Sequence, residues 1–122
     1  MLRLKFSVIF LFAVIVVSAC VSSKPRRYVI AESKAYEASL FRQNCAICHG
    51  PEGEGRTLDE GLVVPSLRTG EFKFKTESEI KRQISAGGNG MTSFRNQLTE
   101  REIDLMVDFV HNDLRSGQNH LR

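Results

Sequence analysis

The chain has 122 residues, of which 42% are hydrophobic, and this length suits one small domain. Its formal net charge is +3, and its acidic and basic residues are interspersed along the sequence. No basic face that would follow a phosphate backbone is predicted from this pattern, so nucleic-acid binding is not expected.

The N-terminal segment has the features of a secretory signal. Arg3 and Lys5 precede a twelve-residue, largely apolar run over 6–17, and small residues follow before Cys20. This arrangement is typical of a signal peptide, and the run is shorter than the roughly 20 apolar residues of a transmembrane helix. We expect residues 1–19 to be removed, which leaves 103 residues with a net charge of +1.

Residues 17–20, Val-Ser-Ala-Cys, resemble the bacterial lipoprotein signal, in which the cysteine is lipidated and becomes the first residue of the mature protein. We therefore expect lipidation of Cys20, because several acyl chains hold a protein stably on a membrane. The alternative is ordinary cleavage after Ala19, which leaves Cys20 as a single thiol. Residues 20–30 are then a tether, whose basic residues either meet anionic head groups or belong to a solvated linker. The expected location is the periplasmic side of a bacterial membrane.

A helix is predicted over residues 31–44, where apolar residues recur on one side. It leads into the pentad Cys45-Ala46-Ile47-Cys48-His49. Two thiols at this spacing can bond to the two vinyl groups of one haem, and the adjacent histidine can ligate its iron, so the pentad indicates c-type haem attachment. Residues 50–75 are rich in glycine and proline and are predicted to be a loop, which suits a small domain if it wraps around one edge of a haem.

Two other uses of the cysteine pair remain open. A thioredoxin-type redox pair follows a buried strand, whereas a predicted helix precedes this pair and no alternation of strands and helices follows it. A structural zinc site needs four ligands, and the remaining candidates, Cys20, His111 and His120, are not paired. With Cys20 lipidated and Cys45 and Cys48 bonded to haem, no disulfide is expected.

Two further helices are predicted from their start signals. The capping box at residues 76–79 predicts a helix that ends at glycines 87 and 88. A second capping box at 99–102 precedes an amphipathic stripe over 103–114, which predicts a final helix that ends near Gly117. No segment alternates with period two over a useful length, so the expected fold class is all-α.

From Glu37 to Leu114 the chain resembles the small class I cytochromes c. The resemblance depends on CAICHG at 45–50, Pro65-Ser66-Leu67, Gly90-Met91-Thr92-Ser93-Phe94, the closing helix with Phe109, and an aromatic residue at Phe41. It implies a class I cytochrome c fold over residues 31–117, with three to four helices around one haem c. Residues 118–122 are expected to be a disordered tail.

The resemblance also implies roles for individual residues. Cys45 and Cys48 would hold the haem covalently, His49 would be the proximal iron ligand and Met91 the distal one. The Pro65 carbonyl would accept a hydrogen bond from the outer nitrogen of His49, and such contacts orient the ring and tune its basicity.

Other residues compete less well for the distal position. Met106 lies in the apolar stripe and is expected in the core. His111 is expected to face solvent, and His120 lies in the tail. The sequence departs from the family pattern at Thr92, where a proline often follows the ligand methionine, which predicts a more mobile distal loop. It also departs at Glu37, where a glycine often allows close helix crossing, so that either Ala38 makes this contact or the crossing shifts.

A haem iron with both axial positions filled suits one-electron transfer and leaves no position for a substrate. We therefore expect a membrane-anchored electron carrier that is not an enzyme. Its redox protein partners would dock near Lys73, Lys75, Thr92 and Ser93. One alternative is a haem c subunit permanently docked on a respiratory oxidase, reductase or dehydrogenase. Another is a haem-based sensor or peroxidase-like enzyme from which Met91 departs, although no acid–base histidine is evident near it.

Overall fold

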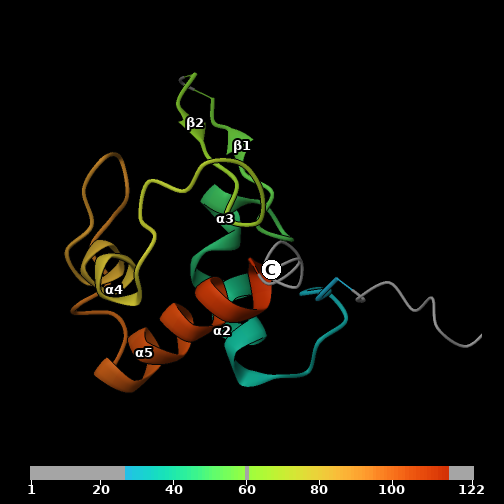
Figure 1. Cartoon of the computed structure of the whole chain (residues 1–122), viewed down its shortest axis with the longest axis vertical. Helices are drawn as coiled ribbons and strands as arrows, with labels where there is room; N and C mark the ends of the chain where they lie inside the picture. Colours follow the sequence, from blue (N-terminus) through green and yellow to red (C-terminus); the bar gives the residue numbers. More distant parts are fainter. Residues whose placement is uncertain (1–26, 60, 116–122) are drawn as a thin grey trace, which may run out of the picture.

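The computed structural model describes residues 27–59 and 61–115. The predicted signal peptide, Cys20, Gly117 and His120 therefore lie outside the described residues. Figure 1 shows a helical body from which a two-stranded hairpin projects. Its elements are α2 (Tyr36–Asn44), α3 (Ala46–His49), β1 (Arg56–Thr57), β2 (Val63–Val64), α4 (Glu77–Ala86), α5 (Glu100–Asp108) and the π-helical segment η1 (Phe109–Leu114). In this part of the chain, no helix has both the length and the apolar character needed to cross a bilayer.

Both predicted capping boxes are present. The Thr76 hydroxyl accepts a hydrogen bond from the Glu79 backbone N–H at 3.3 Å, and the Glu79 carboxylate accepts one from the Thr76 N–H at 2.9 Å. Thr99 and Glu102 repeat the arrangement at 3.3 and 2.8 Å. The helix α4 ends at Gly87, as predicted, because the left-handed φ of 71° at this residue interrupts the helical backbone.

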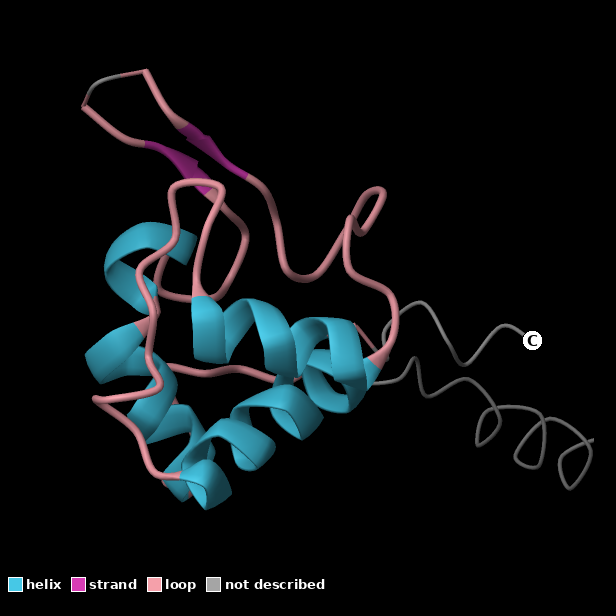
Figure 2. Ribbon diagram, turned by 90° about the vertical axis from the view of Figure 1, so that its left-hand side faces the viewer, coloured by secondary structure: helices cyan, strands magenta, loops and turns pink. Residues whose placement is uncertain are grey.

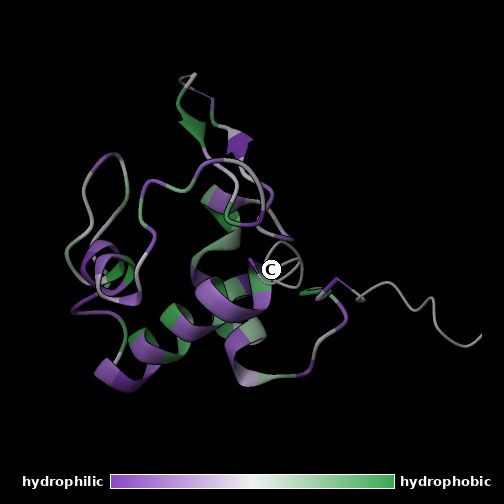
Figure 3. Cartoon of the chain, in the orientation of Figure 1, coloured by the Kyte–Doolittle hydropathy of each residue, from purple (hydrophilic) through white to green (hydrophobic). Residues whose placement is uncertain are grey.

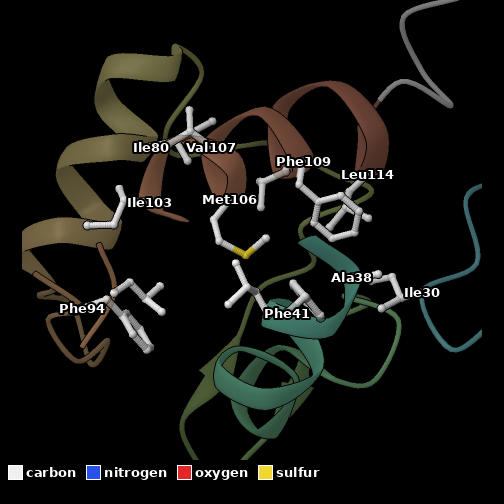
Figure 4. Packing of buried hydrophobic residues seen from close by; sticks show 13 residues of the cluster. Ile30, Ala38, Phe41, Ile80, Phe94, Ile103, Met106, Val107, Phe109 and Leu114 are labelled. Atoms are coloured by element: carbon white, nitrogen blue, oxygen red, sulfur yellow. The ribbon is translucent and has the colours of Figure 1, made fainter. Parts of the chain in front are cut away.

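The last helical stretch, α5 continued by η1, supplies six of the thirteen buried hydrophobic residues, in agreement with the predicted apolar stripe. Its buried side chains are those of Ile103, Met106, Val107, Phe109, Val110 and Leu114 (Figure 4). The Phe109 ring meets Tyr28 and Phe41 edge-on, at centroid distances of 5.2 and 6.0 Å. Met106 is 1% exposed and is therefore core filler, as expected. Figure 3 shows the apolar sides of the helices turned toward one another.

The first helix is shorter than predicted. It begins at Tyr36, not at residue 31, because side chains form hydrogen bonds with the backbone N–H and C=O groups of the preceding residues. The Ser33 hydroxyl accepts from the Ala35 N–H at 3.2 Å, and Arg42 donates to the carbonyls of Ile30 and Ser33 at 2.6 and 3.0 Å. Local hydrogen bonds of this kind compete with the helical ladder. Residues 30–35 therefore form a turn that packs against α2.

The packed domain also begins before the predicted boundary at residue 31. Ile30 is fully buried, and Tyr28 packs against the core. Tyr28 and Ile30, which the sequence analysis placed in the tether, thus pack against the folded body. Ala38 on α2 is also fully buried, whereas Glu37 is half-buried. The small side chain at the packed position is therefore Ala38.

The glycine-rich segment 50–75 is mostly loop, as predicted, but it contains a hairpin that was not predicted. Arg56 pairs with Val64 and Thr57 with Val63 in antiparallel register. Strands of two residues are too short to show a period-two pattern in sequence. Figure 2 shows this hairpin extending away from the helices. The end of the segment is held by Arg115, which donates to the Phe74 carbonyl at 2.9 Å and stacks over the Phe72 ring.

Candidate functional site

The pentad that is predicted to attach haem forms a single helical turn. The helix α2 ends at Asn44, and α3 begins at Ala46, so that Cys45 lies at the junction. The N–H groups of Cys48 and His49 both donate to the Cys45 carbonyl, at 3.1 and 2.9 Å. Arg56 donates to the Ile47 carbonyl at 3.2 Å and ties this turn to the hairpin. Local hydrogen bonding thus presents two thiols and one imidazole from five consecutive residues.

The two thiols do not form a disulfide. Cys45 is partly buried and Cys48 is exposed. Burial, and secondarily the neighbouring Cys48, raises the pKa of the Cys45 thiol to about 12. A thioredoxin-type pair depends on a thiol with a lowered pKa, so the environment of Cys45 argues against that alternative. The described residues also contain no group of three or more His, Cys, Asp or Glu side chains able to hold a metal ion, and the zinc alternative lacks a ligand set there.

The imidazole of His49 lies partly buried behind this turn. Its Nδ1 atom is buried and makes no hydrogen bond within the described residues. Burial lowers the pKa of His49, while the Pro65 backbone carbonyl, acting as an acceptor toward the ring, partly opposes this shift. We read the two observations as a near approach of the Pro65 carbonyl that falls short of hydrogen-bond geometry. The carbonyl that the sequence analysis predicted as an acceptor for His49 is therefore close to this ring.

Two loops hold this arrangement, and we call residues 50–55 and 64–68 together the proximal loops. Gly55 lies directly against the backbone of the second loop. A Cβ atom at Gly55 would fall 2.5 Å from the Val64 carbonyl oxygen and 2.7 Å from the Pro65 carbonyl carbon. Gly55 has a φ of 80° and donates its N–H to the His49 carbonyl at 2.8 Å. Only glycine fits here, and its absent side chain lets Pro65 approach the histidine.

Met91 lies in a second region, the distal loop, which we define as residues 87–94. Gly88 and Met91 exchange two backbone hydrogen bonds, at 2.8 and 3.0 Å, across Asn89 and Gly90. These two residues have φ values of 54° and 84°. This is a two-residue hairpin turn of the Asn-Gly kind, which needs positive φ at both central positions. Met91 is half-buried and packs against the core at the end of this turn.

A side chain that the sequence analysis did not single out contacts the Met91 sulfur. The Gln83 Nε2 atom lies 3.7 Å from the Met91 Sδ atom and donates to the Gly88 carbonyl at 2.8 Å. Gln83 stands eight residues before Met91, in the last turn of α4. Its only sequence signal is this position at the end of a helix that precedes the methionine.

The distal loop is fixed without a proline after Met91. A Cβ atom at Gly87 would meet the Met91 carbonyl oxygen at 2.6 Å and the Thr92 carbonyl carbon at 2.7 Å. The Ser93 hydroxyl donates to the Ser85 carbonyl at 2.6 Å. Phe94, which is buried, follows directly in the chain. These contacts join the loop to the end of α4 where the family pattern often has a rigid proline ring.

The structure places the other predicted residues as follows. His111 has 31% of its side chain exposed and contacts Asn112 and Glu77, with Nδ1 at 3.0 and 3.6 Å from their oxygens. Lys73 donates to Asn89 at 3.0 Å and so borders the distal loop. Leu62, in the loop that connects β1 and β2, lies against the distal loop, and its side chain would be 3.2 Å from a Cβ at Gly90. Among the hydrogen bonds of the described residues, none joins Met91 directly to the pentad.

A haem c fits these residues. Both thiols are unbonded, the Cys45 environment keeps its thiol protonated, and the buried Nδ1 of His49 has an acceptor beside it. A thioether from a separate loop supplies a soft ligand. Cys45, Cys48 and His49 can therefore hold the porphyrin and its iron from one side, with Met91 available as a second axial ligand.

Comparison with known proteins agrees with this chemistry. Residues 35–110 match the protein family described as "Cytochrome C oxidase, cbb3-type, subunit III". The chain is 28% identical over 88 residues to cytochrome c6 of Thermosynechococcus vestitus, which covers 72% of this chain and 77% of that protein. It is 36% identical over 83 residues to cytochrome c-550 of Bacillus subtilis, covering 66% and 62%. A third match is cytochrome c6 of Parathermosynechococcus lividus, 29% identical over 80 residues, covering 66% and 90%.

Proposed function

Because the chain belongs to the c-type cytochrome family described as "Cytochrome C oxidase, cbb3-type, subunit III", and so carries covalently attached haem c, we propose that it is a membrane-anchored electron carrier. It passes single electrons between redox proteins on the periplasmic side of a bacterial membrane. The observation that carries this proposal is the helical turn that presents Cys45, Cys48 and His49 together, with the His49 Nδ1 buried beside Pro65.

The proposed roles follow from the chemistry of each side chain. Cys45 and Cys48 would form two thioether bonds that prevent loss of the haem, and His49 and Met91 would ligate its iron. The haem iron supplies one-electron redox chemistry. If His49 and Met91 both ligate the iron, no position would be left for a substrate, and the folded loops would limit reorganisation on redox change. This arrangement suits electron transfer and would leave no open site on the iron for catalysis.

The pentad lies at the surface of the domain, where a partner can approach. Ile47 has 74% of its surface exposed, and Cys48 beside it is also exposed. On the other side of the proposed site, Lys73, Lys75 and Thr92 are exposed as well. We propose that redox partners dock at this part of the surface, because electron transfer requires a short distance between donor and acceptor.

The anchor is proposed from the sequence alone, through lipidation of Cys20. Mass measurement of the mature protein tests it together with haem addition. The expected result is loss of residues 1–19 and a gain of one haem and of acyl chains. A mature protein that carries haem but begins at residue 20 without acylation would exclude the lipid anchor.

A second candidate is a haem c subunit that stays docked on a larger respiratory complex. The description of the matched family, which names a subunit of an oxidase, favours it, whereas the names of the relatives, cytochrome c6 and cytochrome c-550, do not refer to a complex. Detergent extraction followed by sizing distinguishes the candidates. A carrier leaves the membrane alone, and a subunit leaves it inside a complex.

The optical spectrum tests the ligand assignment. The oxidised protein should show a methionine-to-iron charge-transfer band, and the reduced protein should not bind carbon monoxide. Met91→Ala should abolish the band and allow carbon monoxide to bind, whereas Met106→Leu, at a core position, should keep the wild-type spectrum. A wild-type protein that binds carbon monoxide would instead favour the sensor or peroxidase-like reading.

A further inference from the structure

A buried ion pair lies between the two proximal loops. The Arg68 Nη2 atom is 3.0 Å from the Glu52 Oε2 atom, and the Arg68 Nε also donates to the main-chain carbonyl of Glu52. The Arg68 side chain is only 3% exposed, and that of Glu52 is 21% exposed. The guanidinium therefore holds both the side chain and the backbone of the residue that lies three positions after His49.

Stability alone is a poor explanation for this pair. Removing two charges from water costs free energy that their attraction often fails to recover, and an apolar pair of similar size is often at least as stable. Arg68 also carries a buried Nη1 atom with no hydrogen-bond partner among the described residues, which adds a further cost. Because the pair costs free energy in this way, we infer that it serves to fix the relative position of the two loops.

The geometry that the pair controls is the meeting of His49 and Pro65. Arg68 stands three residues after Pro65, and its backbone N–H donates to the Ser66 hydroxyl at 3.0 Å. The Leu67 N–H donates to the Gly53 carbonyl at 2.9 Å, parallel to the ion pair. One loop begins at His49 and the other contains Pro65, so a change in their separation moves the acceptor relative to the imidazole.

The Glu52 carboxylate also fixes the segment that enters the domain. Its Oε2 and Oε1 atoms accept hydrogen bonds from the N–H groups of Ile30 and Ala31, at 2.9 and 2.7 Å. The Ile30 side chain is fully buried. Both carboxylate oxygens are therefore engaged, and the carboxylate itself is held in place by backbone that is part of the core.

We propose that Glu52 and Arg68 are positioning residues for the proximal ligand, which set the approach of the Pro65 carbonyl to the His49 Nδ1 and thereby the reduction potential of the haem. The proposal rests on the proposed function through the assignment of His49 as a ligand. When a ligating imidazole donates its second N–H to a carbonyl, it becomes a stronger electron donor. Stronger donation favours the oxidised iron. Loosening the two loops should therefore shift the potential to more positive values.

The test uses the full-length haem-loaded protein and two conservative variants. Arg68→Lys keeps the charge but cannot hold the carbonyl and the carboxylate of Glu52 at once. Glu52→Gln keeps one acceptor oxygen but loses the charge. In both variants we expect a more positive reduction potential. We also expect exchange of the His49 Nδ1 proton in the reduced protein, measured by NMR, to become about fivefold faster, the change expected when a hydrogen bond worth about 1 kcal/mol is lost.

Thr99→Ala serves as the control, because it removes the capping box of α5 and lowers stability away from the proximal loops. It should leave the potential unchanged. If Arg68→Lys does not fold, the double variant Glu52→Gln/Arg68→Met removes the pair without leaving an unpaired charge, and the same shifts are expected.

The inference is overturned if the variants retain the wild-type potential and the wild-type proton exchange. It is also overturned if Thr99→Ala shifts the potential equally, since the effect would then reflect stability alone. A wild-type protein without a low-spin histidine–methionine spectrum would instead refute the proposed function, and the two failures are thus distinguishable.

Discussion

The proximal and distal sides of this site both depend on a closely packed glycine, but different contacts hold their loops in place. Each depends on one glycine with positive φ that lies against the backbone of a neighbouring segment: Gly55 lies against Pro65, and Gly87 against Met91 and Thr92. The proximal loops are then fastened by a buried ion pair and by backbone hydrogen bonds. The distal loop is fastened by a tight turn and by mostly exposed side chains.

This difference predicts different responses to perturbation. His49 belongs to the same helical turn as the two thiols that we propose hold the haem. The loops that support this turn are held by a desolvated ion pair, so the support is rigid. Met91 reaches the site through a separate loop whose contacts are weaker individually. The proximal side should therefore determine the tuning of the iron, and the distal side should determine how easily a ligand is displaced.

The largest effect should come from the two glycines. Gly55→Ala and Gly87→Ala each place a Cβ atom within 2.7 Å of backbone atoms at a positive φ, and we expect each to lower the free energy of unfolding by about 2–4 kcal/mol. Gly61→Ala is the matched control, since its φ of 78° is similar but no atom lies within 4 Å. It should cost only about 1–2 kcal/mol. Chemical denaturation measures all three, and equal losses would show that backbone strain alone matters.

Removing the side-chain amide beside the Met91 sulfur should affect the distal side selectively. Gln83→Leu removes the contact to the sulfur and the hydrogen bond to Gly88. If these contribute about 1 kcal/mol to the closed loop, added imidazole should bind the oxidised protein about fivefold more tightly. Gln43→Leu removes an exposed hydrogen bond to Ser39 on α2 and should leave imidazole binding unchanged. An unchanged affinity in Gln83→Leu would mean that the turn alone holds Met91.

The free energy of unfolding should fall in acid, because one carboxylate caps each of the helices α4 and α5. The Thr76 and Lys75 backbone N–H groups lower the pKa of Glu79 below 4.5, and Tyr36 and Thr99 likewise lower that of Glu102. A lowered pKa in the folded state stabilises the fold above about pH 4.5, and this contribution is lost as the pH falls through the lowered value. The unfolding free energy of Glu79→Gln/Glu102→Gln should therefore decline less steeply in this range than that of the wild type. A parallel decline would assign the acid sensitivity to other groups.

The smallest effect should come from the exposed contact between Lys73 and Asn89. Lys73→Met should change the unfolding free energy by less than about 0.5 kcal/mol, because both side chains are solvated. If Lys73 belongs to the docking surface, the same variant should slow electron transfer to an acidic partner at low ionic strength. Arg95→Met, at another exposed position, is the control for a general loss of positive charge.

Local sequence patterns were sufficient wherever the relevant contacts are short in sequence. The pentad, the two capping boxes, the stop at Gly87 and the buried stripe from Ile103 to Leu114 were all predicted, because each depends on residues within one or two helical turns. The start of the first helix was predicted five residues too early. Arg42 donates hydrogen bonds to the carbonyls of residues 30 and 33, and the spacing of apolar residues does not reveal such polar contacts.

The sequence by itself determined the class of chemistry expected of this protein, since five consecutive residues contain the two thiols and the histidine that we propose bind one haem. Only the tertiary structure decided what surrounds that histidine. The partners of Glu52 are 16 and 21–22 residues away, and the contact of Gly55 with Pro65 joins two loops across a hairpin. Such contacts form only when segments distant in the sequence pack together. The order of residues along the chain does not show which of these segments come into contact.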